Sequence, residues 1–114
     1  MTVSEMARAL ELETIVEGDI NRQITGGYAG DLLSWVMGKA REGDAWITVM
    51  GNLNVIAVAV LADIPCVVLS EGASLDDDAA KRADVECITV LKSNLTTFGL
   101  CARLARLLDG GMHD

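Results

Sequence analysis

The chain has 114 residues, the size of one domain, and a domain of this length buries roughly two-thirds of its unfolded surface. Its formal net charge of −8 argues against nucleic-acid partners, because those are held by clustered Lys and Arg. Hydrophobic residues make up 51% of the chain and aromatic residues only 4%, so we expect a core built from aliphatic side chains.

Three cysteines, Cys66, Cys87 and Cys101, sit within apolar runs and lack the spacing of metal ligands. We predict that they are reduced core residues, which is typical of the cytoplasm, and we predict no metal site. The N-terminus has neither the basic nor the apolar region of a signal peptide. The longest apolar run, residues 55–62, is far shorter than the roughly 20 residues of a membrane span. We therefore expect a cytoplasmic protein with no membrane partner.

The first third of the chain predicts two helices and one strand. Residues 4–10 predict a short helix with Ser4 as its N-cap. Residues 12–16 alternate between two faces and predict a short strand. Residues 25–31 are the most glycine-dense segment and predict a loop. This loop leads into a helix over residues 32–40, where apolar side chains recur at helical spacing.

The middle of the chain predicts two buried strands joined by a helix. Residues 45–50 and 65–70 are apolar on every side, as parallel strands covered on two faces tend to be. Parallel neighbours need a crossover connection. The apolar segment 55–62 is therefore predicted to be a buried helix that follows a turn at residues 51–54.

The last third predicts two helices and a further strand. Ser74 has the form of a capping box, and the acidic triplet 76–78 suits a helix N-terminus better than a metal site. Residues 87–91 predict another core strand, and Asn94 is predicted to cap a final helix. A glycine pair should end that helix, so that the tail 110–114 frays. One apolar stripe runs along it: Leu100, Cys101, Leu104, Ala105 and Leu108.

This alternation predicts an α/β fold, a three-layer α/β/α sandwich with a mainly parallel sheet of four or five strands, in one domain over residues 1–114. Open parallel sheets bind ligands at the carboxyl ends of their strands, where glycine-rich turns expose backbone amides. Four loops are therefore candidate ligand-binding segments. They hold Thr25, Gly26 and Gly27; Gly51 and Asn52; Ser70, Glu71 and Gly72; and Ser93, Asn94, Thr96 and Thr97.

Signatures of catalysis are missing from the sequence. The only histidine, His113, lies in the last two residues, where it cannot be held against a nucleophile. Neither a Walker loop nor a dinucleotide-binding glycine fingerprint occurs. We predict no catalytic residues and no cofactor, and an enzyme that uses Asp19 or Glu71 with Arg22 stays a less favoured alternative. Trp35 lies off its helix's apolar stripe, which favours either an exposed interface residue or partial burial.

Three segments resemble the DRTGG domain family, which is also similar to the N-terminal domain of bacterial HPr kinase. They read ITGGYAGDLL at residues 24–33, GDAWITV at 43–49 and VLKSNLTTF at 90–98, and the resemblance covers most of the chain. In the family, Asp-Arg and Thr-Gly-Gly follow two successive strands. Here the corresponding positions hold Asn52-Leu53 and Ser70-Glu71-Gly72, and both depart from the family pattern.

Domains of this family accompany phosphotransacetylases, CBS-containing pyrophosphatases and HPr kinase as non-catalytic parts. The resemblance implies a regulatory or ligand-sensing module that forms a homodimer and binds a small anionic metabolite or nucleotide. A protein-interaction adaptor, docked on a metabolic or redox enzyme through an apolar face, is the alternative. Neither hypothesis involves a nucleic acid.

Overall fold

The computed structural model describes residues 1–113, with side chains for residues 1–109. One sheet forms its centre, in the strand order β1-β5-β4-β3-β2. The strands are β1 (Glu13–Val16), β2 (Gly26–Ala29), β3 (Asp44–Thr48), β4 (Cys66–Leu69) and β5 (Thr89–Lys92). Strands β2 to β5 run parallel, and β1 is antiparallel to β5. The predicted mainly parallel sheet of four or five strands is confirmed, and it has five strands.

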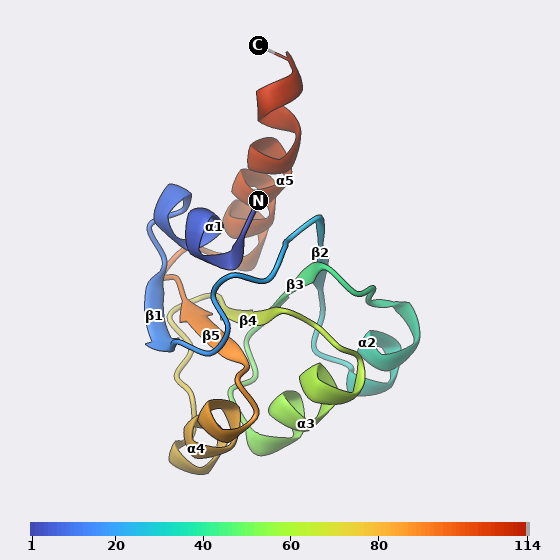
Figure 1. Ribbon diagram of the computed structural model, residues 1–114, viewed down its shortest axis with the longest axis vertical. Helices are drawn as coiled ribbons and strands as arrows, with labels where there is room; N and C mark the ends of the chain where they lie inside the picture. The colour runs from blue at the N-terminus through green and yellow to red at the C-terminus, as the bar shows by residue number, and fades with distance from the viewer. Residues whose placement is uncertain (114) are drawn as a thin grey trace.

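Helices cover both faces of the sheet (Figure 1). One face carries α1 (Val3–Ala9) and α5 (Thr97–His113), and the other carries α2 (Leu33–Lys39), α3 (Leu53–Leu61) and α4 (Asp77–Val85). Neighbouring side chains of β4 enter opposite cores, since Val67 packs on the α3 side and Val68 on the α5 side. The three-layer α/β/α arrangement is therefore confirmed.

The crossover between β3 and β4 follows the prediction. Helix α3 begins two residues before the predicted start, because the Asn52 side chain accepts a hydrogen bond from the Val55 backbone nitrogen at 3.1 Å. Its inward face is fully buried at Val55 and Ile56. A buried helix between two parallel strands is what the apolar segment 55–62 predicted.

The prediction of a loop over residues 25–31 is wrong, because Gly26–Ala29 forms β2 and pairs with β3. These glycines provide space at the edge of the sheet. A Cβ on Gly26 would lie 2.7 Å from the Asp44 carboxylate, and one on Gly27 would lie 2.9 Å from Leu104. Close packing therefore explains the glycines in a strand, where their propensity alone disfavours them.

Thr2, and not the predicted Ser4, caps α1. The Thr2 hydroxyl accepts a hydrogen bond from the Glu5 nitrogen at 3.1 Å, and the Glu5 carboxylate accepts one from the Thr2 nitrogen at 2.8 Å. The hydrogen bond from the Thr2 backbone lowers the pKa of Glu5 below its usual value. The helix itself is confirmed, shifted by one residue.

Two further predicted caps are wrong. Helix α4 has Asp76 and not Ser74 as its N-cap, and the Asp76 nitrogen donates to the Gly51 carbonyl oxygen at 2.7 Å. Helix α5 starts three residues beyond Asn94, where the Thr96 hydroxyl accepts from the Gly99 nitrogen at 3.1 Å. It continues through the glycine pair that was predicted to end it. The predicted fraying of the tail 110–114 stays a prediction, because the side chains of these residues and the whole of residue 114 lie outside the described part of the structure.

The three cysteines differ in burial. Cys66 is fully buried, Cys101 is partly buried and Cys87 is exposed in the turn before β5. The prediction of core residues is thus confirmed for Cys66 and wrong for Cys87. Burial raises the pKa of the Cys66 thiol to about 12.

We expect the reactivity of each thiol to increase with the exposure of its cysteine. A disulfide reagent at pH 8 is expected to modify Cys87 first in the folded protein. Cys66 should react at least about 1,000-fold more slowly, because its thiolate is scarce and its sulfur is buried. Absorbance of the released thiolate measures the rates, and Cys87→Ser should abolish the fast phase. A fast phase that survives this substitution would contradict the assignment.

Candidate functional site

Three of the four predicted ligand-binding loops meet at one edge of the sheet. They follow β3, β4 and β5, whose carboxyl ends face the same way because these strands are parallel. The Gly72 nitrogen donates to the Ser93 carbonyl oxygen at 2.9 Å, and the Glu71 nitrogen donates to the Leu95 carbonyl oxygen at 2.8 Å. The loops after β4 and β5 are therefore joined. The carbonyl oxygen of Gly51, which follows β3, accepts a hydrogen bond from the Asp76 nitrogen at the start of α4.

The fourth loop does not join them. Thr25 precedes β2, and its nitrogen donates to the Gly43 carbonyl oxygen at 2.9 Å, beside the first residue of β3. Thr25 and Gly26 thus lie at the amino edge, and Gly27 lies within the strand. The expectation that they share the carboxyl edge is wrong, because it treated residues 25–31 as a loop that follows a strand.

Two carboxylates of the chain already accept hydrogen bonds from backbone amides at the carboxyl edge. Asp31 accepts from the Thr48 hydroxyl at 2.6 Å and from the Val49 nitrogen at 3.1 Å. Glu71 accepts from the nitrogen of Thr97, the first residue of α5, at 2.7 Å. Such amides are where a free anion binds in many α/β folds. Glu71 and Asp31 therefore fill anion positions themselves, and an anionic ligand needs other partners.

A hollow of about 330 Å³ lies beside this network, at the carboxyl end of β5. Lys92 and Arg103 bring a positive charge from β5 and another from α5. Neither forms an ion pair with any side chain of residues 1–109. The hollow is lined by Leu10, Glu11, Glu13, Lys92, Ser93, Asn94, Leu95 and Arg103.

Sequence reasoning selected Ser93 and Asn94 as site residues but neither cation of this hollow. Lys92 is the first residue of the same candidate loop, and that position could have drawn attention to it. Arg103 lies off the apolar stripe of α5, and it was assigned no role from the sequence. In a chain with 9 basic residues against 17 acidic ones, this hollow brings together two cations from different elements, beside Glu11 and Glu13.

No family model matches the chain, and no curated protein matches it. Solved structures do match it. The chain is similar to the regulatory region of a Clostridium perfringens pyrophosphatase, which contains CBS and DRTGG domains and is complexed with its activator, diadenosine tetraphosphate. The TM-score is 0.67 at 13% identity, over 94% of this chain and 45% of that chain. This likeness shows a shared fold, and this chain spans less than half the length of that regulatory region's chain.

Of the residues in the alternative catalytic hypothesis, Glu71 lies far from Arg22, whereas Asp19 lies near it, with the Arg22 backbone nitrogen 3.5 Å from the Asp19 carbonyl oxygen. Arg22 pairs with Asp63 at 3.0 Å before β4, at the amino edge, whereas Glu71 lies at the carboxyl edge. Asp19 is near the amino edge, and its carboxylate accepts from the Asn21 nitrogen at 3.1 Å. The structure therefore separates Glu71 from Arg22. The side chain of His113 lies outside the described residues.

Other predicted features can also be placed. Trp35 is 55% exposed, and the Lys39 ammonium lies 4.1 Å from the centre of its ring. Among the described residues, no group of three His, Cys, Asp or Glu side chains is arranged to hold a metal. No helix within residues 1–113 is long and apolar enough to cross a membrane.

Proposed function

We propose that this chain is a regulatory, ligand-sensing domain of the DRTGG type, cytoplasmic and homodimeric, that binds a small anionic ligand at the carboxyl edge of its sheet. The two unpaired cations of the β5–α5 hollow, Lys92 and Arg103, carry this proposal. The similar pyrophosphatase region supports it, because that region binds a nucleotide activator.

A nucleotide suits the mixed charge of the hollow. Its phosphate would accept charge-assisted hydrogen bonds from Lys92 and Arg103. Glu11 and Glu13 line the same hollow and need donors, which the hydroxyl groups of a ribose supply. The Ser93 hydroxyl oxygen already accepts from the Leu95 nitrogen at 3.1 Å, so its proton is free to bind a further acceptor.

Such binding would have a consequence for the fold. The two cations belong to different elements, so an anion held between them would tie the end of β5 to α5. A ligand that links two elements in this way stabilises the arrangement in which both contacts are made. Ligand binding could thereby be transmitted along α5, which is what a regulatory domain requires.

Arg103→Gln is expected to weaken nucleotide binding about 10-fold or more, because it removes a charge-assisted hydrogen bond. Titration calorimetry with AMP, ATP and diadenosine tetraphosphate measures the affinity. Arg106→Gln is the matched control, since Arg106 is on the same helix and does not line the hollow. The proposal is wrong if none of these nucleotides binds the unaltered protein, or if both variants lose affinity equally.

An adaptor remains the second candidate, because Phe98 is 85% exposed in the first turn of α5. An exposed aromatic side chain of this kind is typical of a protein contact. The two functions are separated by purification from native extract. A stoichiometric enzyme partner that is lost with Phe98→Ser, together with no bound metabolite, would favour the adaptor.

A further inference from the structure

Strand β2 leaves one side of its backbone open. It is the last strand of the sheet, and no other strand of residues 1–113 pairs with its outer side. The Gly30 nitrogen donates to the Ile47 carbonyl oxygen at 3.1 Å, so the backbone groups of Gly30 and Tyr28 face β3. Those of Gly27 and Ala29 therefore face outward. Such an edge is a ready template for another strand.

The two edges of the sheet differ in charge. Residues 25–30, which contain β2, carry no charged side chain, although the chain has 17 acidic and 9 basic residues. At the other edge, β1 contains Glu13, follows Glu11 and precedes Glu17. Its register is also irregular between Thr14 and Val16. Charges and irregular register discourage strand pairing, so the β2 edge is the one suited to it.

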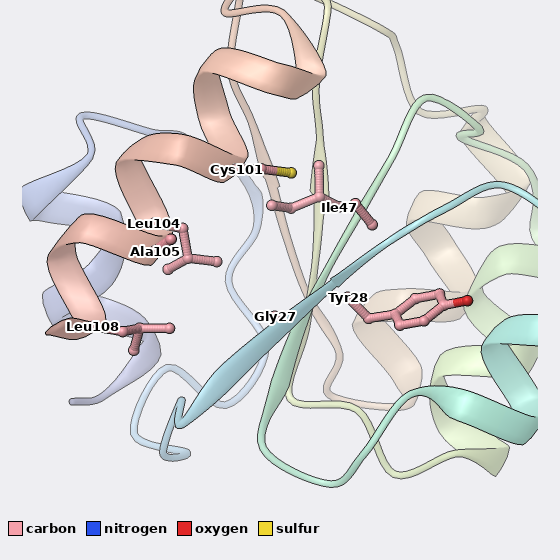
Figure 2. Close-up of a pocket in the computed structure, with 8 residues that line it drawn as sticks. Gly27, Tyr28, Ile47, Cys101, Leu104, Ala105 and Leu108 are labelled. Atoms are coloured by element: carbon pink, nitrogen blue, oxygen red, sulfur yellow. The ribbon is translucent and has the colours of Figure 1, made fainter.

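An apolar groove lies next to this open edge. Helix α5 passes over β2 and β3, and a hollow of about 250 Å³ remains between helix and sheet (Figure 2). Tyr28 points away from α5 in this view. The end of α5 extends beyond the rest of the domain (Figure 1). The groove is lined by Gly27, Tyr28, Ala29, Ile47, Cys101, Leu104, Ala105 and Leu108.

We propose that two copies of this chain pair antiparallel through their β2 edges, with the two α5 helices packed side by side across the two-fold axis. The proposal names the surface for the homodimer and rests on that part of the proposed function. Pairing of β2 with its own copy is isologous and closes after two chains. It would extend the sheet across the dimer and satisfy the outward backbone groups of Gly27 and Ala29.

In this dimer, α5 of the second copy covers the apolar surface of the groove. Both α5 helices lie on the same face of the joined sheet, so strand pairing brings them next to each other. The small Ala105 side chain allows a close approach of the two helices, and Leu108 of one copy can then cover apolar surface of the other. Residues 25–30 carry no charged side chain, so no like charges meet where the two β2 strands pair.

Light scattering after size-exclusion chromatography tests the surface. The unaltered protein is expected at twice the 12.1 kDa mass of one chain. Ala105→Glu should raise the dimer dissociation constant about 100-fold or more, because two carboxylates would face each other across the axis. Ala102→Glu is the matched control, as Ala102 is exposed on the same helix but does not line the groove, and it should remain dimeric.

Ala29→Pro gives an independent test that does not touch α5. It removes an outward backbone N–H, leaves the bonds to β3 in place and should also produce a monomer. Circular dichroism confirms that each variant is folded. A dimer that persists in both variants would overturn the proposed surface and leave the homodimer standing. A monomeric unaltered protein would overturn both, while nucleotide binding is measured separately through Arg103.

Discussion

Trp46→Ala is expected to lower the free energy of unfolding by about 3–5 kcal/mol. Trp46 is 0% exposed and is the largest of the fully buried side chains. Its indole nitrogen also donates a hydrogen bond to the Gly30 carbonyl oxygen at 2.9 Å, which ties β3 to the end of β2. The substitution leaves a cavity and removes that bond. Urea unfolding followed by far-ultraviolet circular dichroism measures the loss.

The chain's other tryptophan provides the control. Trp35 is mostly exposed, so Trp35→Ala should cost less than about 1 kcal/mol, chiefly through the lost contact with Lys39. Fluorescence of this variant then reports on Trp46 alone, and its emission should shift to longer wavelengths on unfolding. Equal losses of stability in the two variants would contradict the burial assigned to them.

The core strands were predictable because their sequence is apolar on both faces. The predicted strand 45–50 overlaps β3 in all but its first residue, 65–70 contains β4, and the crossover argument correctly made the segment 55–62 a helix. Strand β2 was missed for a physical reason. Its glycines fit because Asp44 and Leu104 approach them closely, and these residues are far away in the sequence. Tertiary packing overrode the local preference of glycine for turns.

The site was predictable only as far as strand direction was known. The loops after β3, β4 and β5 converge because these strands are parallel, as the apolar pattern indicated. The position of Thr25 depended on recognising β2, so it was placed at the wrong edge. Lys92 and Arg103 come together through the packing of α5 against the sheet, and no spacing in the sequence marks that contact.

The helix caps were also mispredicted, because they too depend on long-range contacts. Ser4 and Ser74 both have the expected sequence pattern, yet Thr2 and Asp76 hold the N-cap positions. At α4, the Asp76 nitrogen binds the Gly51 carbonyl oxygen across the carboxyl edge. A long-range bond of this kind decides which of several good capping residues is used, and the local pattern cannot show it.

Gly51→Ala is expected to lower the free energy of unfolding by about 3 kcal/mol, since it overpacks this same contact. A Cβ at Gly51 would overlap the Ser74 carbonyl oxygen and lie 2.9 Å from the Leu75 Cα atom. Both neighbours are backbone atoms, so the segment before α4 must move. That movement also breaks the Gly51–Asp76 hydrogen bond, which holds this connection to the end of β3.

Gly38→Ala is the matched control, because it makes the same change where no atom lies within 4 Å of the new Cβ. Gly38 is in α2, so alanine there should stabilise the protein by about 0.5–1 kcal/mol. Urea unfolding of both variants measures the two opposite shifts. If Gly51→Ala were as well tolerated as Gly38→Ala, residues 73–76 would not be packed against the end of β3. The carboxyl edge would then lack the fixed geometry that a ligand site there needs.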